Sequence, residues 1–323
     1  MKIEYINPLS MSWQRMTKAL FKPFAIGKWF VLGFTAFLAQ LMDSCGTGPS
    51  SSFHESGEPV NLPDIGHAPE KIADWISSHP FLMAAILMGI LILIAIILVI
   101  TWLSSRGTFM FLDNVVHDRA LVVKPWREYK VQGDSLFLWR VGFGVVFALF
   151  LLTSLVFIFI PIVQFSRGQY ALPNILFFSL IGLLWLLGSV IAAYISLFTT
   201  SFVVPIMYRH NLRILQAWQK FLPILKSHFI YFFLYGLFFL LLCIVIVIAA
   251  FLAGCLTCCF GFILLSLPYI GSVCLLPISF TMRALSLEFL AQWGTDYSIF
   301  PENASSAENV PPPPTPPPAG VNV

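Results

Sequence analysis

Between Phe229 and Thr281 the chain carries no Asp, Glu, Lys, Arg or His over 53 consecutive positions. A membrane-crossing helix needs about 20 mostly apolar residues, so this stretch is too long for one crossing and long enough for two. The segment 254–261, which is bounded by glycines and rich in small residues, divides it. We therefore expect two transmembrane helices joined by a tight turn.

The composition of the whole chain agrees with a lipid environment. Apolar residue types make up 58% of its 323 residues, charged types make up 10%, and the mean hydropathy is +0.86. A soluble protein carries about 25% charged residues, so this chain cannot cover a water-facing surface. These values exclude a soluble enzyme and a disulfide-dense secreted domain. The net charge of only +3 also argues against a nucleic-acid partner.

The uncharged runs predict an all-α, polytopic membrane helix bundle. We expect six transmembrane helices, arranged as three hairpins, with short amphipathic helices on the cytoplasmic side. The expected spans are 24–42, 81–103, 141–165, 175–197, 229–253 and 260–281. Residues 1–298 then form one membrane domain, and the Pro-rich residues 299–323 form a disordered cytoplasmic tail. For the first span, 24–42, a re-entrant or interfacial segment is the alternative.

The distribution of charge between the loops predicts the topology. Lys and Arg gather in cytoplasmic loops, and six spans with both termini inside place 16 of the 18 basic residues there. The loop from Asp43 to Pro80 carries six acidic residues and one lysine, which is typical of the opposite side. We expect a multi-pass protein of the bacterial inner membrane with both termini in the cytoplasm.

A short pattern recurs three times along the chain and predicts an internal repeat. A tryptophan is followed eleven residues later by a phenylalanine at three places: Trp13 and Phe24, Trp126 and Phe137, Trp218 and Phe229. Each even-numbered span ends in a hydroxyl residue followed by phenylalanine: Thr108-Phe109, Ser201-Phe202 and Ser279-Phe280. Repeats in membrane folds can place a site at their shared axis.

The segments around the three tryptophans are candidate membrane anchors. A basic helix with an apolar face lies in the headgroup layer of a membrane, and Leu9, Trp13, Met16, Leu20 and Phe24 form such a face in the first segment. Packing against neighbouring cytoplasmic loops is the alternative. The candidate interfacial anchors are Trp13, Arg15, Lys18, Lys22, Trp126, Arg127, Trp218 and Lys220.

Four cysteines fall on the predicted outer side: Cys45, Cys255, Cys258 and Cys259. They leave three alternatives open. The cysteines pack as small apolar residues at a tight turn, or Cys45 forms a disulfide with one of the other three, or the thiolates bind zinc. The spacing by itself is not that of a zinc site.

No motif predicts catalysis, and no ionisable residue lies well inside a predicted span. We expect no cofactor, no metal site and no enzyme activity. The leading hypothesis is a protein that acts through membrane lipids or an unidentified membrane protein partner at its cytoplasmic face. The alternative is a carrier or exporter of an apolar or lipid-like solute. A cavity lined by hydroxyls and by carbonyls of a helix broken near Pro268, Gly271 and Pro277 would favour the carrier, and a filled bundle would favour the contact role.

Several stretches of the chain resemble known sequences. RGTFMFLDN at 106–114, PWREY at 125–129, SLFL at 135–138 and FVVPIMY at 202–208 resemble uncharacterised bacterial multi-pass proteins classed as a domain of unknown function. More distantly, the three-hairpin layout is similar to the membrane domain fused to some glycerophosphodiester phosphodiesterases. The resemblance implies residence in the inner membrane. It implies no phosphodiesterase activity, because these residues hold no catalytic domain.

Overall fold

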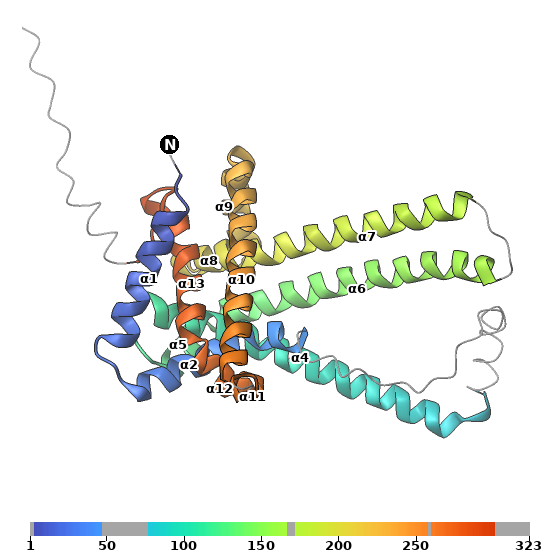
Figure 1. Cartoon of the computed structure of the whole chain (residues 1–323), viewed down its shortest axis with the longest axis horizontal. Helices are drawn as coiled ribbons and strands as arrows, with labels where there is room; N and C mark the ends of the chain where they lie inside the picture. The colour runs from blue at the N-terminus through green and yellow to red at the C-terminus, as the bar shows by residue number, and fades with distance from the viewer. Residues whose placement is uncertain (1–2, 47–76, 167–171, 258–259, 301–323) are drawn as a thin grey trace, which may run out of the picture.

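The computed structural model describes residues 3–46, 77–166, 172–257 and 260–300, and these contain helices and no strand (Figure 1). The all-α class is confirmed. The elements are α1 (Ile6–Phe21), α2 (Ile26–Gly46), α4 (Pro80–Val116), α5 (Val123–Glu128), α6 (Lys130–Ser166), α7 (Leu172–Phe198), the π-helix η2 (Thr199–Val203), α8 (Val204–His210), α9 (Ile214–Ser227), α10 (Phe229–Leu256), α11 (Phe260–Ser266), α12 (Pro268–Cys274), α13 (Leu276–Ala291) and the 3₁₀-helix η3 (Thr295–Tyr297).

Four helical stretches in the described part of the chain are long and apolar enough to cross a membrane, or five if the bent pair α12–α13 counts as one span. They are Pro80–Val116, Lys130–Leu155, Ser179–His210 and Phe229–Leu256. In the outer half of α4 the consecutive residues Leu91, Ile92 and Leu93 are all exposed. Since neighbouring residues point about 100° apart around a helix, the described part of the chain leaves several sides of this half uncovered. Lipid is the solvent that suits such a surface, so this is a membrane protein.

The helix α2 corresponds to the first predicted span, and its apolar part Ile26–Met42 is shorter than the four candidates. It packs against the inner, buried half of α4 and not against the exposed outer half. The Ser104 hydroxyl donates to the Ala39 carbonyl at 3.0 Å, and Lys28 forms an ion pair with Asp118 at 2.8 Å. The six-span arrangement as three hairpins is therefore not confirmed.

The last predicted span, 260–281, is divided into three helices. Pro268 and Pro277 lie in the first turns of α12 and α13, where the missing N–H of proline costs no hydrogen bond. The axes of α12 and α13 differ by 65°. The helix α13 continues ten residues past the predicted end of the span and carries Glu288. In Figure 1, α10 runs across the direction of α6 and α7.

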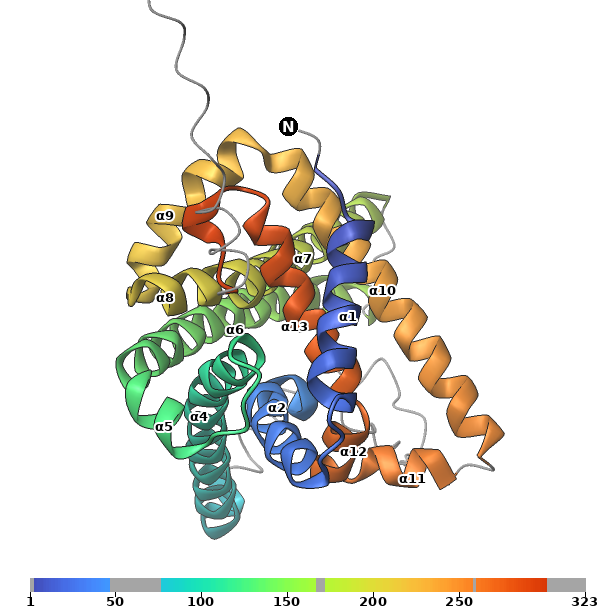
Figure 2. The same cartoon turned by 90° about the vertical axis from the view of Figure 1, so that its left-hand side faces the viewer.

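The core lies where the inner ends of the helices meet, in the compact body from which α4, α6 and α7 project (Figures 1 and 2). Five aromatic side chains from η2, α9, α10 and α13 are fully buried with ring centroids 4.5 to 5.9 Å apart: Phe202, Phe221, Phe232, Tyr235 and Phe289. Ile299 and Phe300 are also buried, so the core extends two residues past the predicted domain boundary at 298.

Candidate functional site

A cavity of about 460 Å³ lies between α2, α4, α6, η2, α10 and α13, and we call it the arginine cavity. Two guanidinium groups line it, one from Arg140 near the start of the apolar part of α6 and one from Arg283 on α13. Its other polar lining residues are Gln40, Thr200, Ser201, Ser279 and Ser286. The rest of the wall is mostly apolar and comes largely from the middle of α10 and from the residues around the α12–α13 bend. None of the described lining residues is acidic.

Hydroxyl groups of α4 orient the Arg140 guanidinium. Its Nη1 donates to Ser104 Oγ at 3.1 Å and to Ser105 Oγ at 3.4 Å, and its Nη2 donates to Thr108 Oγ1 at 3.4 Å. Each of these hydroxyls donates its own hydrogen to a backbone carbonyl. The lone pairs of the hydroxyl oxygens are thereby left to accept from the arginine, and these three neutral acceptors hold it in place.

The Arg283 guanidinium is oriented from the opposite wall. Its Nη1 donates to the Thr200 carbonyl of η2 at 2.8 Å. A π-turn is rare and is frequently found at functional sites. Here it supplies both this carbonyl and the Ser201 side chain to the cavity.

The three hydroxyl–phenylalanine pairs of the sequence meet at this cavity. Ser201 and Ser279 line it, and Thr108 contacts Arg140. The Ser279 hydroxyl also accepts a hydrogen bond from Gln40 Nε2 at 2.8 Å. The phenylalanine of each pair is buried in the surrounding core. Positions that the sequence singles out as equivalent therefore converge on one site.

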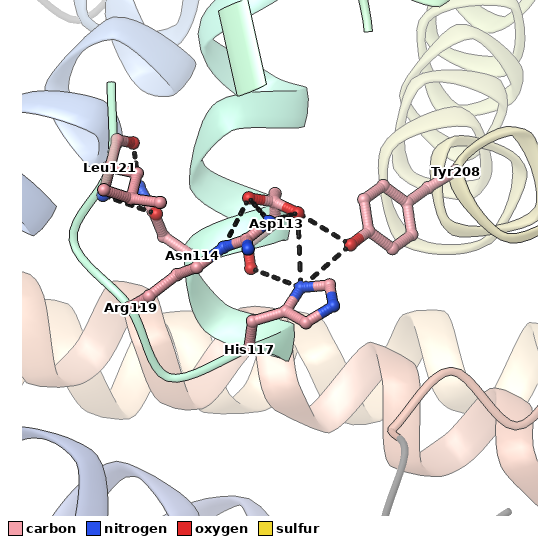
Figure 3. Close-up of polar contacts among 6 residues, drawn as sticks. All are labelled: Asp113, Asn114, His117, Arg119, Leu121 and Tyr208. Atoms are coloured by element: carbon pink, nitrogen blue, oxygen red, sulfur yellow. Dashed lines mark hydrogen bonds and ion pairs between the residues drawn. The ribbon is translucent and has the colours of Figure 1, made fainter. Parts of the chain in front are cut away.

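A second polar cluster lies at the ends of α4 and α8 (Figure 3). The fully buried Asp113 carboxylate accepts from both Arg119 Nε and Nη2, at 3.1 and 2.8 Å, and from the Tyr208 hydroxyl at 2.9 Å. His117 Nδ1 lies 3.2 Å from the same carboxylate and 3.2 Å from the Tyr208 oxygen. Because Arg119 balances the charge of Asp113, this cluster serves to join α4 to α8.

The predicted anchors on α1 are divided between the surface and the protein interior. Trp13 is 58% exposed, and Lys18 and Lys22 are also exposed. Arg15 instead forms a 2.6 Å ion pair with the buried Glu288 of α13 and stacks over a ring of the core. The buried face of α1 is rotated around the helix axis relative to the apolar face that the sequence predicts. Its buried residues are Pro8, Ser12, Met16, Ala19 and Leu20.

The anchors of the second and third segments mostly contact protein. The Trp126 ring lies 5.6 Å from that of Trp102, and the Trp218 ring lies 5.8 Å from that of Trp139. Arg127 is exposed. Lys220 forms a 2.7 Å ion pair with Asp296, and its hydrogen bond holds the pKa of that carboxyl below the ordinary value of 3.8. The interfacial role of the eight anchors stays a prediction.

The cysteine alternatives also stay open. Cys255 is exposed and its thiol is free, whereas Cys258, Cys259 and the side chain of Cys45 lie outside the described residues. Most of the acidic loop lies outside them as well. Within the described ranges, no group of three or more His, Cys, Asp or Glu residues could hold a metal ion.

Sequence reasoning missed the two arginines of the cavity. It counted Arg140 and Arg283 among the cytoplasmic cations, because each lies at the end of an apolar run. The one signal that could have found them is the set of hydroxyl–phenylalanine pairs, since Arg283 follows Ser279 by four residues, one helical turn.

A comparison with protein families assigns the chain. A model described as "Family of unknown function (DUF7544)" matches residues 6–293, in agreement with the expected uncharacterised family. The similarity to the membrane domain of glycerophosphodiester phosphodiesterases stays a prediction. No curated protein and no solved structure matches the chain. Since the match covers most of its length, the chain belongs to DUF7544, a family of unknown function.

Proposed function

We propose that this protein is a non-enzymatic integral membrane protein that binds an anionic, lipid-like molecule in the arginine cavity. The proposal rests on the lining of the cavity, in which Arg140 and Arg283 lie beside an apolar wall. Both arginines lie next to apolar runs of the chain, and charged residues inside a membrane are costly and are therefore functional candidates. A guanidinium also matches the geometry of carboxylate and phosphate oxygens.

The shape and lining of the cavity favour an amphiphile over a soluble anion. Its volume of about 460 Å³ is in the range of small-molecule sites. Phe111, Phe239, Ile246 and Met282 contribute apolar surface, whereas the guanidinium and hydroxyl groups supply hydrogen-bond donors. A ligand with a charged head and a hydrocarbon chain would satisfy both parts of this lining.

The same lining argues for binding and against catalysis. Arginine stays protonated at any physiological pH, so it cannot act as a general base. The described lining residues include serines, a threonine and Cys243, and neither a histidine nor a carboxylate is among them to activate these groups. Nucleophilic catalysis requires such an adjacent base or a lowered pKa.

The direct test is lipid binding by the purified, full-length protein. Native mass spectrometry of the protein in mild detergent should detect a co-purified anionic lipid, and Arg140→Gln and Arg283→Gln should each reduce its occupancy at least tenfold. Arg209→Gln removes the same charge from an exposed position on α8 and should leave the occupancy unchanged. Equal occupancy in all four proteins would refute the proposal.

A carrier function is the second candidate, and the 65° bend between α12 and α13 favours it. Leu275, at the bend, lines the cavity, so straightening of this pair would change its shape. A carrier should move a fluorescent anionic lipid between the leaflets of a proteoliposome faster than protein-free liposomes do. Binding of the anionic lipid without movement between the leaflets would rule out the carrier function and leave the contact role.

We further propose six crossings in the bacterial inner membrane, with both termini in the cytoplasm. The charge of the loops supports this topology, and α2 is then the shortest crossing. Cysteines introduced as Ser50→Cys and Ser305→Cys should react with a membrane-impermeant maleimide from opposite sides, above the labelling of the unmodified chain. Reaction of both from one side would refute the topology.

A further inference from the structure

A groove of about 790 Å³ lies on the surface between α2 and α5, and we call it the α5 groove. Its apolar wall consists of Val31 of α2 and residues 120–123, and its polar rim consists of Lys124, Arg127 and Glu128 of α5. We infer that the α5 groove binds an anionic phospholipid of the surrounding bilayer, with the lipid phosphate at the basic rim and an acyl chain on the apolar wall. This site goes beyond the proposed function, because it shares no lining residue with the arginine cavity.

The first argument is the charge of the rim. Lys124 and Arg127 are exposed, and no residue in the described part of the chain forms an ion pair or a hydrogen bond with either side chain. They are three residues apart on α5, so their Cβ atoms lie about 5 to 6 Å apart on one face of the helix. Glu128 is the one carboxylate among the described lining residues, and it also interacts with the Arg119 guanidinium. The rim therefore carries a net positive charge, which favours an anionic lipid over a zwitterionic one.

The second argument is the depth of the groove in the membrane. The helix α4 is one of the four candidate spans, and Val99 is its last exposed residue. Trp102 follows Val99 by three positions, a rise of about 5 Å. The Trp126 ring of α5 lies 5.6 Å from the Trp102 ring, and Figure 2 shows α5 beside α4. The head-group layer is about 5 to 8 Å thick on each side of a bilayer, and tryptophan is enriched in it. The helix α5 therefore lies at the level of the lipid head groups.

The third argument is that α5 is fixed in place by protein contacts. Pro125 is buried, and the guanidinium carbon of Arg106 lies 5.1 Å from the centroid of the Trp126 ring. A 2.8 Å ion pair with Asp134 of α6 holds Arg106 in turn. Since these contacts occupy one side of α5, the basic side chains are left on the exposed side. A lipid that binds there does not have to order the helix first, which lowers the cost of binding.

The fourth argument is the apolar wall, which distinguishes a lipid from a soluble phosphate. Leu121 is 40% exposed and Val123 is 63% exposed. Soluble phosphate would leave both side chains uncovered, whereas the acyl chain of a phospholipid would cover them. A phospholipid carries its charged and apolar parts next to each other, as the groove does.

The test is photocrosslinking of the purified, full-length protein in nanodiscs with equal amounts of phosphatidylglycerol and phosphatidylcholine. The photoreactive amino acid p-benzoylphenylalanine takes the place of Val123, at the edge of the groove. Mass spectrometry of the lipid adducts should show phosphatidylglycerol enriched at least threefold over phosphatidylcholine. The same amino acid in place of Leu91, on the exposed half of α4, is the matched control and should give both lipids in equal amounts.

Variants test the role of the charges. Lys124→Gln combined with Arg127→Gln should abolish the enrichment at position 123, and Glu128→Gln, which removes the carboxylate, should increase it. Arg209→Gln removes a positive charge from an exposed position on α8 and should leave the enrichment unchanged. Arg283→Gln should also leave it unchanged, so that failure of this inference and failure of the proposed function are distinguishable.

Four results would overturn the inference. Equal amounts of the two lipids at position 123 would show that the groove does not select an anionic lipid. Lipid adducts at position 91 without any at position 123 would show that the groove does not face lipid. Loss of the enrichment in excess glycerol 3-phosphate would assign the rim to a soluble phosphate. A crosslinked dimer in place of lipid adducts would assign the groove to a second copy of the chain.

Discussion

The contact between α2 and α4 depends on the absence of a side chain at Gly107. A Cβ atom added there would lie 2.6 Å from Leu38 Cβ, 2.7 Å from the Leu38 carbonyl carbon and 2.9 Å from the Ala39 nitrogen. Carbon atoms in contact lie about 3.5 to 4.0 Å apart, so α2 must move by roughly 1 Å in Gly107→Ala. Two of the three atoms belong to the backbone, and rotation of a side chain cannot relieve the clash.

The size of the effect follows from a comparison with Gly89→Ala. Gly89 lies on the outer half of the same helix, and its added Cβ would meet nothing within 4 Å. Both variants gain the same helix propensity, about 1 kcal/mol, which cancels in the comparison. The difference is then the cost of overpacking, about 1 to 3 kcal/mol. Gly107→Ala should unfold at a Tm at least roughly 2 °C below that of Gly89→Ala.

Thermal unfolding in detergent, followed by tryptophan fluorescence, measures this difference. Ligand occupancy is a second readout, because Gln40 lies two residues from Leu38 on α2 and donates to Ser279 in the cavity. Movement of α2 should therefore weaken ligand binding as well. If the two alanine variants have the same Tm and the same occupancy, α2 does not pack on the inner half of α4 as described.

Two further predictions concern ion pairs. Asp113→Ala leaves the Arg119 guanidinium without its buried carboxylate partner. It should lower the free energy of unfolding by about 3 kcal/mol, measured by denaturant titration. An unchanged denaturation midpoint would show that the cluster does not join α4 to α8. Asp296→Asn should remove the ion pair with Lys220. Because the pKa of Asp296 is lowered in the folded state, wild type should be the more stable protein above about pH 4, and this advantage should be lost as the pH falls through the lowered pKa. An advantage that does not decrease as the pH is lowered from about 4 would contradict the assignment.

The membrane class and several helix starts could be predicted because both depend on local composition. The expected spans beginning at 81 and 229 start within one residue of α4 and α10. The ends of the helices were harder to predict, because a helix can continue past the end of its apolar run. The helix α4 continues to Val116 past Arg106, whose guanidinium is paired with Asp134 at 2.8 Å.

The arginine cavity could not be predicted, because its parts come from six helical elements separated by up to 247 positions in the sequence, from Ala39 to Ser286. The uncharged runs indicate which segments leave water. They carry no information on how these segments are arranged relative to one another. The position of α2 shows this: its apolar run predicts a crossing, and only tertiary packing places it beside the polar inner half of α4. The 65° bend after α12 could be suspected from Pro277 but not measured.

The π-helix η2 determines which side of α8 meets α4. A π-turn absorbs one extra residue, which turns everything after it by about 100° relative to an uninterrupted α-helix. Upstream, α7 presents mostly lipid-facing residues; downstream, Val204, Ile206 and Met207 are buried and Tyr208 reaches Asp113. Removing one residue from Thr199–Val203 would restore the α-helical phase and swing Tyr208 away from its partner. The register of η2 therefore affects two places at once: the cavity wall, to which η2 contributes, and the contact between α4 and α8.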